Sequence, residues 1–476
     1  MKKTNNKFLV WVIVSISATG GLLFGFDIGV ISGAIPYFQK RFALDNSWVE
    51  LITTSGLVGA VIGAMFCGRV ADILGRKKVI LASAVVFAIG AIWSGLAPSA
   101  IDLLIARLFL GLAIGVSSFA VPLYIAEISP TKIRGTLVSM FQLLVTIGVL
   151  VSYFSDLAFA VPENDPGYNE CWRPMLYVGA IPAVIMFIGM IFLPETPRWL
   201  ISKGREQKCR EVLQKVEEPE LIEEVISKMK EEMLQDSGKW TEIFKPWLRS
   251  ALMIAIGIMF LQQFTGINTI IYYSPKIFLM AGFDGVKAAI MGSVSVGIAL
   301  VIFTVVSLFM IDKLGRRKLF FIGLSGMIVA LLALGFCFAF HNILGNSIKI
   351  LTIGFILLYI CFFAMSLGPL GWLIISEVFP LKVRGVGASI GSLANWLFNG
   401  VVAFTFFKII KGLTLSGSEI TINGENLGNP AGAFWLYALV GIAGLFWGYF
   451  YLPETKGKTL EQIEEHWRNR KSPKEL

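Results

Sequence analysis

Charged residues are scarce in this chain. Asp, Glu, Lys and Arg make up 15% of its 476 residues, whereas hydrophobic residues make up 55%. A water-soluble domain carries charges on about a quarter of its residues. The shortage excludes an ordinary soluble enzyme and indicates a protein that crosses a membrane many times.

Histidines and paired cysteines are also rare. The two histidines, His341 and His466, do not lie where they could carry a proton across a membrane. The five cysteines are scattered and form no C-x-x-C pair, so we expect neither a disulfide framework nor a metal site. Phosphate-binding, zinc and calcium-loop patterns are missing too. We therefore expect no cofactor beyond a proton.

One catalytic pattern occurs, at Gly387-Ala-Ser389-Ile-Gly391, which matches the G-x-S-x-G signature of serine hydrolases. These residues lie inside a long apolar run, with no preceding strand and no available histidine. We reject nucleophilic catalysis on these grounds and do not expect an enzyme.

Long apolar runs dominate the sequence. A run of about 20 residues is long enough to cross a bilayer as a helix. The sequence therefore predicts an all-α membrane protein with twelve transmembrane helices, six on each side of a charged segment. The runs lie near residues 9–33, 50–70, 79–97, 102–125, 136–158, 173–193, 250–280, 288–311, 318–340, 348–373, 385–410 and 432–452.

Basic residues gather in every second loop. They occur in the first seven residues and at 68–78, 126–135 and 312–318, whereas the loop at 159–171 has none. By the positive-inside rule, these loops and both termini face the cytoplasm. We expect a multi-pass protein of the cell inner (plasma) membrane. Because the net charge of +9 is divided among loops, we expect no nucleic-acid partner.

The charged segment at 203–245 interrupts the apolar pattern. Its opposite charges recur at spacings of three and four, which favours short solvated helices. We interpret it as a cytoplasmic helical linker without chemistry of its own. The expected organisation is an N-terminal six-helix half, a linker, a C-terminal six-helix half and a cytoplasmic tail, at 1–193, 194–249, 250–452 and 453–476.

Three motifs recur in the same order in the two halves. They are DILGRKK from Asp72 and DKLGRRK from Asp312, EISPTKIRG from Glu127 and EVFPLKVRG from Glu377, and PET at 194–196 and 453–455. Repeated six-helix halves place a transporter's binding site at their interface near the bilayer midplane. The sequence therefore predicts a carrier.

The motifs resemble those of the sugar porter family of the major facilitator superfamily, over nearly the whole chain. The resemblance implies that superfamily's fold and a rocker-switch transporter of monosaccharides or polyols, similar to bacterial proton-coupled symporters and to facilitative glucose transporters. The motifs are GRVADILGRKK (68–78), VPLYIAEISPTKIRG (121–135), PETPRWL (194–200), QQFTGINTIIYYSP (262–275), GPLGWLIISEVFPLKVRG (368–385) and PETKGKTL (453–460).

The first apolar run contains a single acid, Asp27, within GGLLFGFDIGVISGA. A lone acid at the centre of a membrane helix costs about 2.5–3.5 kcal/mol and indicates function. Asp27 is the only acid that we place deep in a span, away from the loop motifs. The resemblance implies a proton-coupling acid that forms and breaks a pair with Arg107 of the fourth run. A static ion pair is the alternative.

Amides inside membrane helices are costly unless they are paired, and they both donate and accept hydrogen bonds. They therefore suit sugar hydroxyls, as aromatic rings suit the C–H face of a sugar. For any single amide, a bond between helices is the alternative. By resemblance, the sugar contacts are Phe24, Gln142, Gln262, Gln263, Asn268, Tyr272, Trp372, Asn395 and Trp396.

Opposite charges also flank the cytoplasmic span ends, where they resemble an inner gate. We expect pairs that form when the inner side closes and break when it opens. The alternative is that these charges only set the topology. The expected pairs are Asp72 with Arg76, Glu127 with Arg134, Asp312 with Arg316, and Glu377 with Arg384.

The leading interpretation is proton-coupled sugar import by a functional monomer. A uniporter with a structural Asp27 is the first alternative. A sugar sensor is less well supported because the tail after Glu454 is short, and a drug–proton antiporter is disfavoured by PETPRWL and QQFTGIN. The sequence does not identify the sugar.

Overall fold

The twelve predicted spans are all present in the computed structural model, which describes residues 6–130, 133–234, 240–380, 383–414, 417–422, 425–458 and 460–476. Within these ranges, twelve helical segments are long and apolar enough to cross a membrane, which confirms the expected number. Several of them extend beyond the apolar run that predicted them; the first span continues to Arg41.

The first six spans are formed by seven helices, because a turn at Gly179 separates the last two. The helices are α1 (Asn6–Arg41), α2 (Asn46–Leu74), α3 (Arg76–Leu96), α4 (Ala100–Ile128), α5 (Arg134–Phe159), α6 (Trp172–Val178) and α7 (Ala180–Phe192).

The charged segment that follows is helical, as its charge spacing predicts. Pro219 begins a short 3-10 turn between its two longer helices, and Arg210 pairs with Glu206 one turn earlier at 2.8 Å. The elements are α8 (Pro197–Ser202), α9 (Glu206–Val216), η1 (Pro219–Leu221), α10 (Ile222–Leu234), η2 (Trp240–Phe244) and η3 (Pro246–Leu248).

The second half contains two spans that are broken in the middle. The seventh span bends at Gly266, whose φ of 92° lies in the left-handed region that glycine adopts without strain. The tenth span breaks at Ser366. The elements are α11 (Arg249–Phe264), α12 (Ile267–Met280), α13 (Val286–Leu314), α14 (Arg316–Ala339), α15 (His341–Leu344), α16 (Ser347–Met365), α17 (Leu367–Val378), α18 (Arg384–Leu413), α19 (Ala431–Tyr451), α20 (Leu460–Arg468) and η5 (Pro473–Glu475).

A small antiparallel pair of strands precedes α19. Strand β1 (Thr421–Ile422) pairs with β2 (Glu425–Asn426), with Thr421 opposite Asn426. The hydrophobic pattern did not predict these strands, since two residues are too few to show an alternation.

The chain forms two compact units. The first comprises the described residues of Met1–Ile28, Ser55–Ser152 and Arg173–Ser237. In it α3 packs along α4 and α7. Small residues bring α2 and α4 together, because a Cβ built on Gly111 would lie 2.0 Å from the carbonyl oxygen of Gly56.

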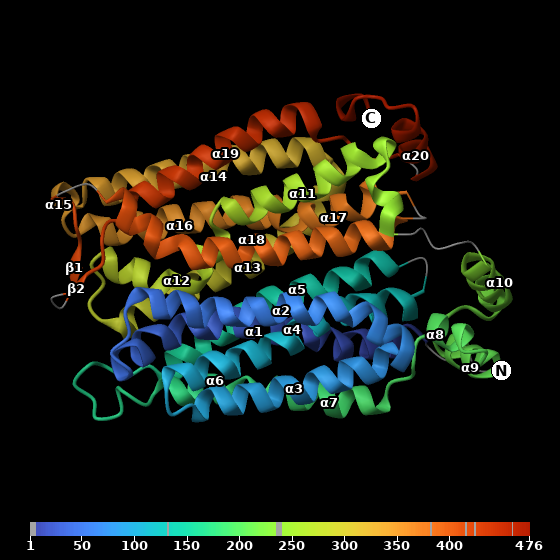
Figure 1. Ribbon diagram of the computed structural model, residues 1–476, viewed down its shortest axis with the longest axis horizontal. Coiled ribbons are helices and arrows are strands. Elements are labelled where there is room, and N and C mark those ends of the chain that lie inside the picture. The colour runs from blue at the N-terminus through green and yellow to red at the C-terminus, as the bar shows by residue number, and fades with distance from the viewer. Residues whose placement is uncertain are drawn as a thin grey trace. The chain divides into compact units, whose positions relative to one another are not determined.

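The second unit comprises the described residues of Gly29–Thr54, Tyr153–Trp172 and Gly238–Leu476. Here α14 packs along both α16 and α19, and α11 packs against α17 and α18 (Figure 1). This unit also contains the C-terminal ends of α1 and α5 and the start of α2. Helix ends from the first half of the chain therefore pack among helices of the second half.

Candidate functional site

A buried ion pair joins α1 to α4 in the first unit. Arg107 donates Nη1 to Oδ1 of Asp27 and Nη2 to Oδ2, the latter at 3.0 Å. The two side chains are 3% and 7% exposed. Bidentate arginine–carboxylate pairs are strong because both bonds involve ionised groups in matched geometry. The structure thus brings together the two residues to which the sequence assigned proton coupling.

Glycines fix the helices around this pair. A Cβ built on Gly25 would lie 1.8 Å from the carbonyl oxygen of Val145 on α5, so the α1 and α5 backbones are in contact beside Asp27. On α2, a Cβ built on Gly56 would lie 3.4 Å from Nη2 of Arg107. A larger residue at position 56 would press on the guanidinium. The close packing of these helix backbones therefore fixes the position of the Asp27–Arg107 pair.

Four of the expected sugar-contacting amides form one buried network in the second unit. Asn268 donates to Oε1 of Gln263 at 2.5 Å, and Gln263 donates to Oε1 of Gln262 at 3.3 Å. Asn395 of α18 donates to that same oxygen at 2.6 Å. Each of the four residues is less than a tenth exposed. The amides hold one another in place and together present a row of polar groups.

The network is anchored at the breaks in the seventh and tenth spans. Nε2 of Gln262 donates to the carbonyls of Leu367 and Gly368 at 2.9 Å each, at the start of α17. In return, the hydroxyl of Tyr359 on α16 donates to the carbonyl of Thr265 at 2.9 Å. Side chains thus satisfy carbonyl groups at both breaks, as irregular backbone within a membrane requires.

The expected aromatic contacts occupy different environments. Tyr272 and Trp396 are buried, whereas Trp372 is 38% exposed. Phe24 and Gln142 are half-buried in the first unit. The expected aromatic residues thus differ in exposure, and Phe24 belongs to the other unit.

Sequence reasoning missed Asn399, which is buried one turn after Asn395 on α18. Its Nδ2 donates to the hydroxyl of Tyr272 at 3.3 Å. Its Oδ1 has no partner among the described residues. Residues four apart share a helix face, so the Asn395–Asn399 spacing was the signal that could have found it.

A charge cluster at one end of the first unit combines all three repeated motifs. Arg76 pairs with Asp72 at 3.0 Å and with Glu127 at 3.1 Å. Thr196 donates its hydroxyl to Glu127 at 2.6 Å. Glu195 accepts the backbone N–H of Lys77 at 3.1 Å and so caps the N-terminus of α3.

The same cluster is present in the second unit. Arg316 donates to Glu377 at 2.7 Å, and Thr455 donates to Glu377 at 2.5 Å. Glu454 accepts the backbone N–H groups of Arg316 and Arg317 at 3.0 Å each. The repeats detected in the sequence therefore build matching structures.

In two of the expected gate pairs, the glutamate bonds with an arginine that the sequence did not assign to it. Glu127 and Glu377 bond with Arg76 and Arg316, the arginines of the neighbouring loop motif, because α4 and α17 end beside the starts of α3 and α14. Arg134 is exposed at the start of α5, and Arg384 is half-buried at the start of α18. The side chain of Asp312 lies outside the described part of the chain.

Asp27 is not the only acid that is buried within a predicted span. Glu50 of α2 and Asp156 of α5 are 1% and 0% exposed. They lie within the runs predicted at 50–70 and 136–158, near the ends opposite the basic loops, where a sequence pattern cannot distinguish a buried acid from a solvated one.

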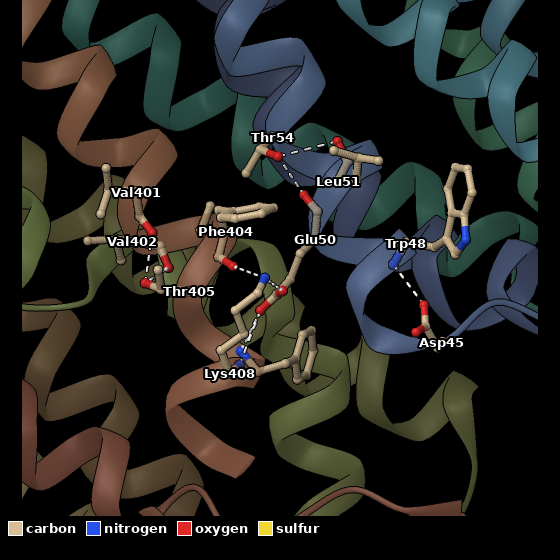
Figure 2. Close-up of polar contacts among 12 residues, drawn as sticks. Asp45, Trp48, Glu50, Leu51, Thr54, Val401, Val402, Phe404, Thr405 and Lys408 are labelled. Carbon is tan, nitrogen blue, oxygen red and sulfur yellow. Dashed lines mark hydrogen bonds and ion pairs between the residues drawn. The ribbon is translucent and has the colours of Figure 1, made fainter. Parts of the chain in front are cut away.

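Glu50 joins α2 to the end of α18 (Figure 2). Its carboxylate forms an ion pair with Lys408 and accepts the backbone N–H of Phe407 at 2.8 Å. The carbonyl of Ala403, which in a regular helix accepts that N–H, accepts the hydroxyl of Tyr273 at 2.9 Å. Lys276 lies alongside and donates to Asn46 of α2 at 2.8 Å. Side chains from α2 and α12 thus bond directly to the α18 backbone.

Metal coordination has no candidate among the described residues, because no group of three His, Cys, Asp or Glu could hold an ion. The candidate residues form a charge pair in the first unit, an amide network in the second unit and one helix-end cluster in each. Amides can bind a polar molecule, and the charged residues can form and break ion pairs. None of these described residues is an activated nucleophile.

Comparisons with known proteins agree with this picture. The family model described as "Sugar (and other) transporter" matches residues 13–467. The arabinose-proton symporter of Escherichia coli K12 is 37% identical over 95% of this chain and 92% of its own. The galactose-proton symporter of that strain is 35% identical over 97% and 95%. The inward open structure of the E. coli xylose transporter XylE has a TM-score of 0.80 and 28% identity over 96% and 100% of the two chains.

Proposed function

The chain belongs to the sugar porter family of the major facilitator superfamily, and from this premise we propose that it imports a monosaccharide or polyol together with a proton. Membership makes the chain a sugar transporter and not an enzyme. The coupled ion, the substrate class and the residue roles are parts of the proposal. Relatives named as arabinose-proton and galactose-proton symporters support it.

The observation that carries the proton assignment is the buried pair of Asp27 and Arg107. A carboxylate in contact with this arginine is held ionised. A carboxylate that has lost the arginine inside the protein is uncompensated, and it takes up a proton. In the proposed cycle, Asp27 is protonated in the outward-open state and releases its proton inward as Arg107 approaches.

The substrate assignment depends on the amide network. Its members present donors and acceptors inside the protein, and a sugar that displaced their mutual bonds would leave no amide unpaired. We propose that the nine residues expected from the sequence contact the sugar and that Asn399, with its unpaired Oδ1, is a tenth.

Replacing the coupling acid tests the proposal. Asp27→Asn removes the titrating group with little change in shape. One charge moving through about 100 mV yields roughly 2.3 kcal/mol, which corresponds to about 50-fold accumulation of sugar. We expect proteoliposomes with the variant to lose this accumulation and to retain sugar exchange. Undiminished accumulation would contradict the proposal.

A uniporter remains the second candidate, because the bidentate Asp27–Arg107 geometry is also what a static structural pair would show. The two candidates differ in proton movement. When sugar is added to a weakly buffered suspension of cells or vesicles, a symporter makes the outer medium alkaline and a uniporter leaves its pH unchanged.

The remaining proposals concern placement and gating. We propose that the chain acts as a monomer in the inner (plasma) membrane with both termini and the linker in the cytoplasm, as the basic loops indicate. The helix ends near Glu50 and Asp156 then face outward. The cytoplasmic gate residues are expected to exchange partners as the inner side opens and closes.

A further inference from the structure

Asp156 is a buried acid for which the proposed cycle has no use. It lies one turn before the C-terminal end of α5 and is 0% exposed. Neither of its carboxyl oxygens has a hydrogen-bond partner among the described residues. A Cβ built on Gly33 would lie 2.3 Å from Oδ2, so the α1 backbone is pressed against the carboxyl group.

Among the described residues, no cation forms a hydrogen bond with Asp156. The phenols of Tyr37 on α1 and of Tyr153 on its own helix are close enough to interact with its charge. Tyr37 donates to the carbonyl of Val161 at 3.2 Å, and Tyr153 donates to the carbonyl of Ile271 on α12 at 2.9 Å. Both phenols therefore donate their hydrogen bonds to backbone carbonyls and not to Asp156.

Glu50 shows what a charged carboxylate requires in this same unit. Glu50 is 1% exposed and Asp156 is 0% exposed, and Glu50 has the ammonium group of Lys408 and the N–H of Phe407. Asp156 has no ammonium partner among the described residues, and the backbone of Gly33 lies against its carboxyl group. An isolated carboxylate in an apolar interior costs far more than a neutral acid, so such a group binds a proton.

We propose that Asp156 is a second proton-binding site, occupied whenever the outer helix ends are closed over it. Tyr153 lies three residues earlier and therefore on the same side of α5, and its bond to Ile271 shows that α12 covers that side. Opening the outer ends uncovers Asp156 to water, where it ionises. Closing them requires its protonation.

The proton bound by Asp156 does not cross the membrane, whereas the proton bound by Asp27 does. The Asp156 proton arrives from the outside before closure and returns to the outside on reopening, so the number of protons per sugar does not change. Its effect is to make outer pH control how readily the loaded carrier closes. This inference rests on the proposed alternation between outward-open and inward-open states, and it does not require coupling through Asp27.

The test uses sugar exchange by Asp27→Asn proteoliposomes, with the inner pH held constant and the outer pH varied. Because Asp27 no longer titrates, a remaining pH dependence must come from another group. We expect the exchange rate to fall about tenfold per pH unit on the alkaline side. Adding Asp156→Asn, which mimics the protonated acid, should make the profile flat.

The matched control adds Glu163→Gln, which removes an exposed carboxylate from the loop after α5 and should leave the profile of Asp27→Asn unchanged. A profile that is already flat in Asp27→Asn, or one that Asp156→Asn does not alter, would overturn the proposal. Complete loss of exchange in Asp27→Asn would instead count against the proposed function.

Infrared spectroscopy of the purified protein gives a second readout that needs no transport. With the outer ends closed, Asp156→Asn should remove one carboxylic-acid C=O band from the spectrum and leave the carboxylate bands unchanged. Loss of carboxylate absorption would show that Asp156 is ionised and would overturn the proposal even if the exchange assay failed.

Discussion

Glycines allow α1 to approach α5 closely, because the side chain of a glycine is a single hydrogen atom. A Cβ on Gly25 would lie 1.8 Å from the Val145 carbonyl oxygen, and a Cβ on Gly148 would lie 2.3 Å from that of Leu22. These obstacles are backbone atoms, which cannot rotate away. The position of Asp27 therefore depends on residues that have no side chain.

The Gly25→Ala variant should destabilise the protein by about 3 kcal/mol or more, since overpacking against rigid backbone forces the helices apart. Gly354→Ala is the control, because a Cβ there meets nothing within 4 Å. Thermal unfolding in detergent should show a lower midpoint for the first variant and an unchanged or higher one for the second. Equal midpoints would contradict the close approach of α1 and α5.

Cysteine chemistry provides a prediction about pH. Burial raises the pKa of Cys171 and of Cys209 to about 11. Because the thiolate is the reactive form and is populated only as the pH approaches the pKa, both thiols should be almost inert to maleimide at pH 7. Labelling should increase toward pH 10. Stoichiometric labelling of either residue at pH 7, measured by mass spectrometry, would be inconsistent with their burial.

At the scale of single residues, the sequence shows which acids lie inside the spans but does not show which groups surround them. Asp27, Glu50 and Asp156 are all acids inside predicted spans. The first contacts an arginine, the second contacts a lysine and a backbone N–H, and the third has no side-chain partner among the described residues. The partners come from helices far away in the sequence. Only the pair with Arg107 was expected, because a family resemblance supplied the partner.

At the scale of helices, α2 and α18 are linked by an ion pair whose two side chains differ in exposure to solvent. The side chain of Glu50 is 1% exposed and that of Lys408 is 48% exposed. Removing the lysine leaves a buried charge without its cation, whereas removing the acid leaves a cation that water reaches. Breaking a buried pair from one side is costly mainly because of the charge that remains.

Lys408→Met should therefore separate the paired ends of α2 and α18 more than Glu50→Gln does. The measurement is the rate at which an impermeant thiol reagent labels Thr54→Cys, a buried position beside Glu50. We expect a severalfold faster reaction with Lys408→Met. The double variant should return toward the starting rate; additive effects would argue against a direct link.

The breaks at Gly266 and Ser366 are only partly visible in the sequence. Gly266 was a recognisable helix breaker, and glycines and a proline marked the tenth span near residue 368. The sequence did not show that the break falls at Ser366 or that Gln262 bonds to the carbonyls beside it. A serine is compatible with a helix, and only the packing of α11 beside α17 makes this break stable.

On the scale of the whole molecule, the apolar runs and repeats predicted most of the architecture. Twelve spans follow from hydrophobicity alone because lipid imposes one length on every helix. The assignment of the ends of α1, α2 and α5 to a unit made mainly of the second half was not predictable. It depends on side-chain bonds such as that of Tyr153 to Ile271, which hydrophobicity does not encode.

The two charge clusters should respond to mutation in the same way. Arg76→Gln and Arg316→Gln each leave a glutamate without its arginine, and each should lower the unfolding free energy by about 3–5 kcal/mol. Cysteines introduced at the helix ends beside each cluster should also react faster. The control is Arg69→Gln, which changes an exposed residue in the basic loop at 68–78. A loss confined to one cluster would contradict their equivalence.

Each cluster takes its arginine and its paired glutamate from one six-helix half, and its capping glutamate from the segment that directly follows that half. The two clusters therefore share no residue, and a substitution in one leaves every member of the other in place. A defect introduced at one cluster can be compared with an intact internal copy in the same polypeptide.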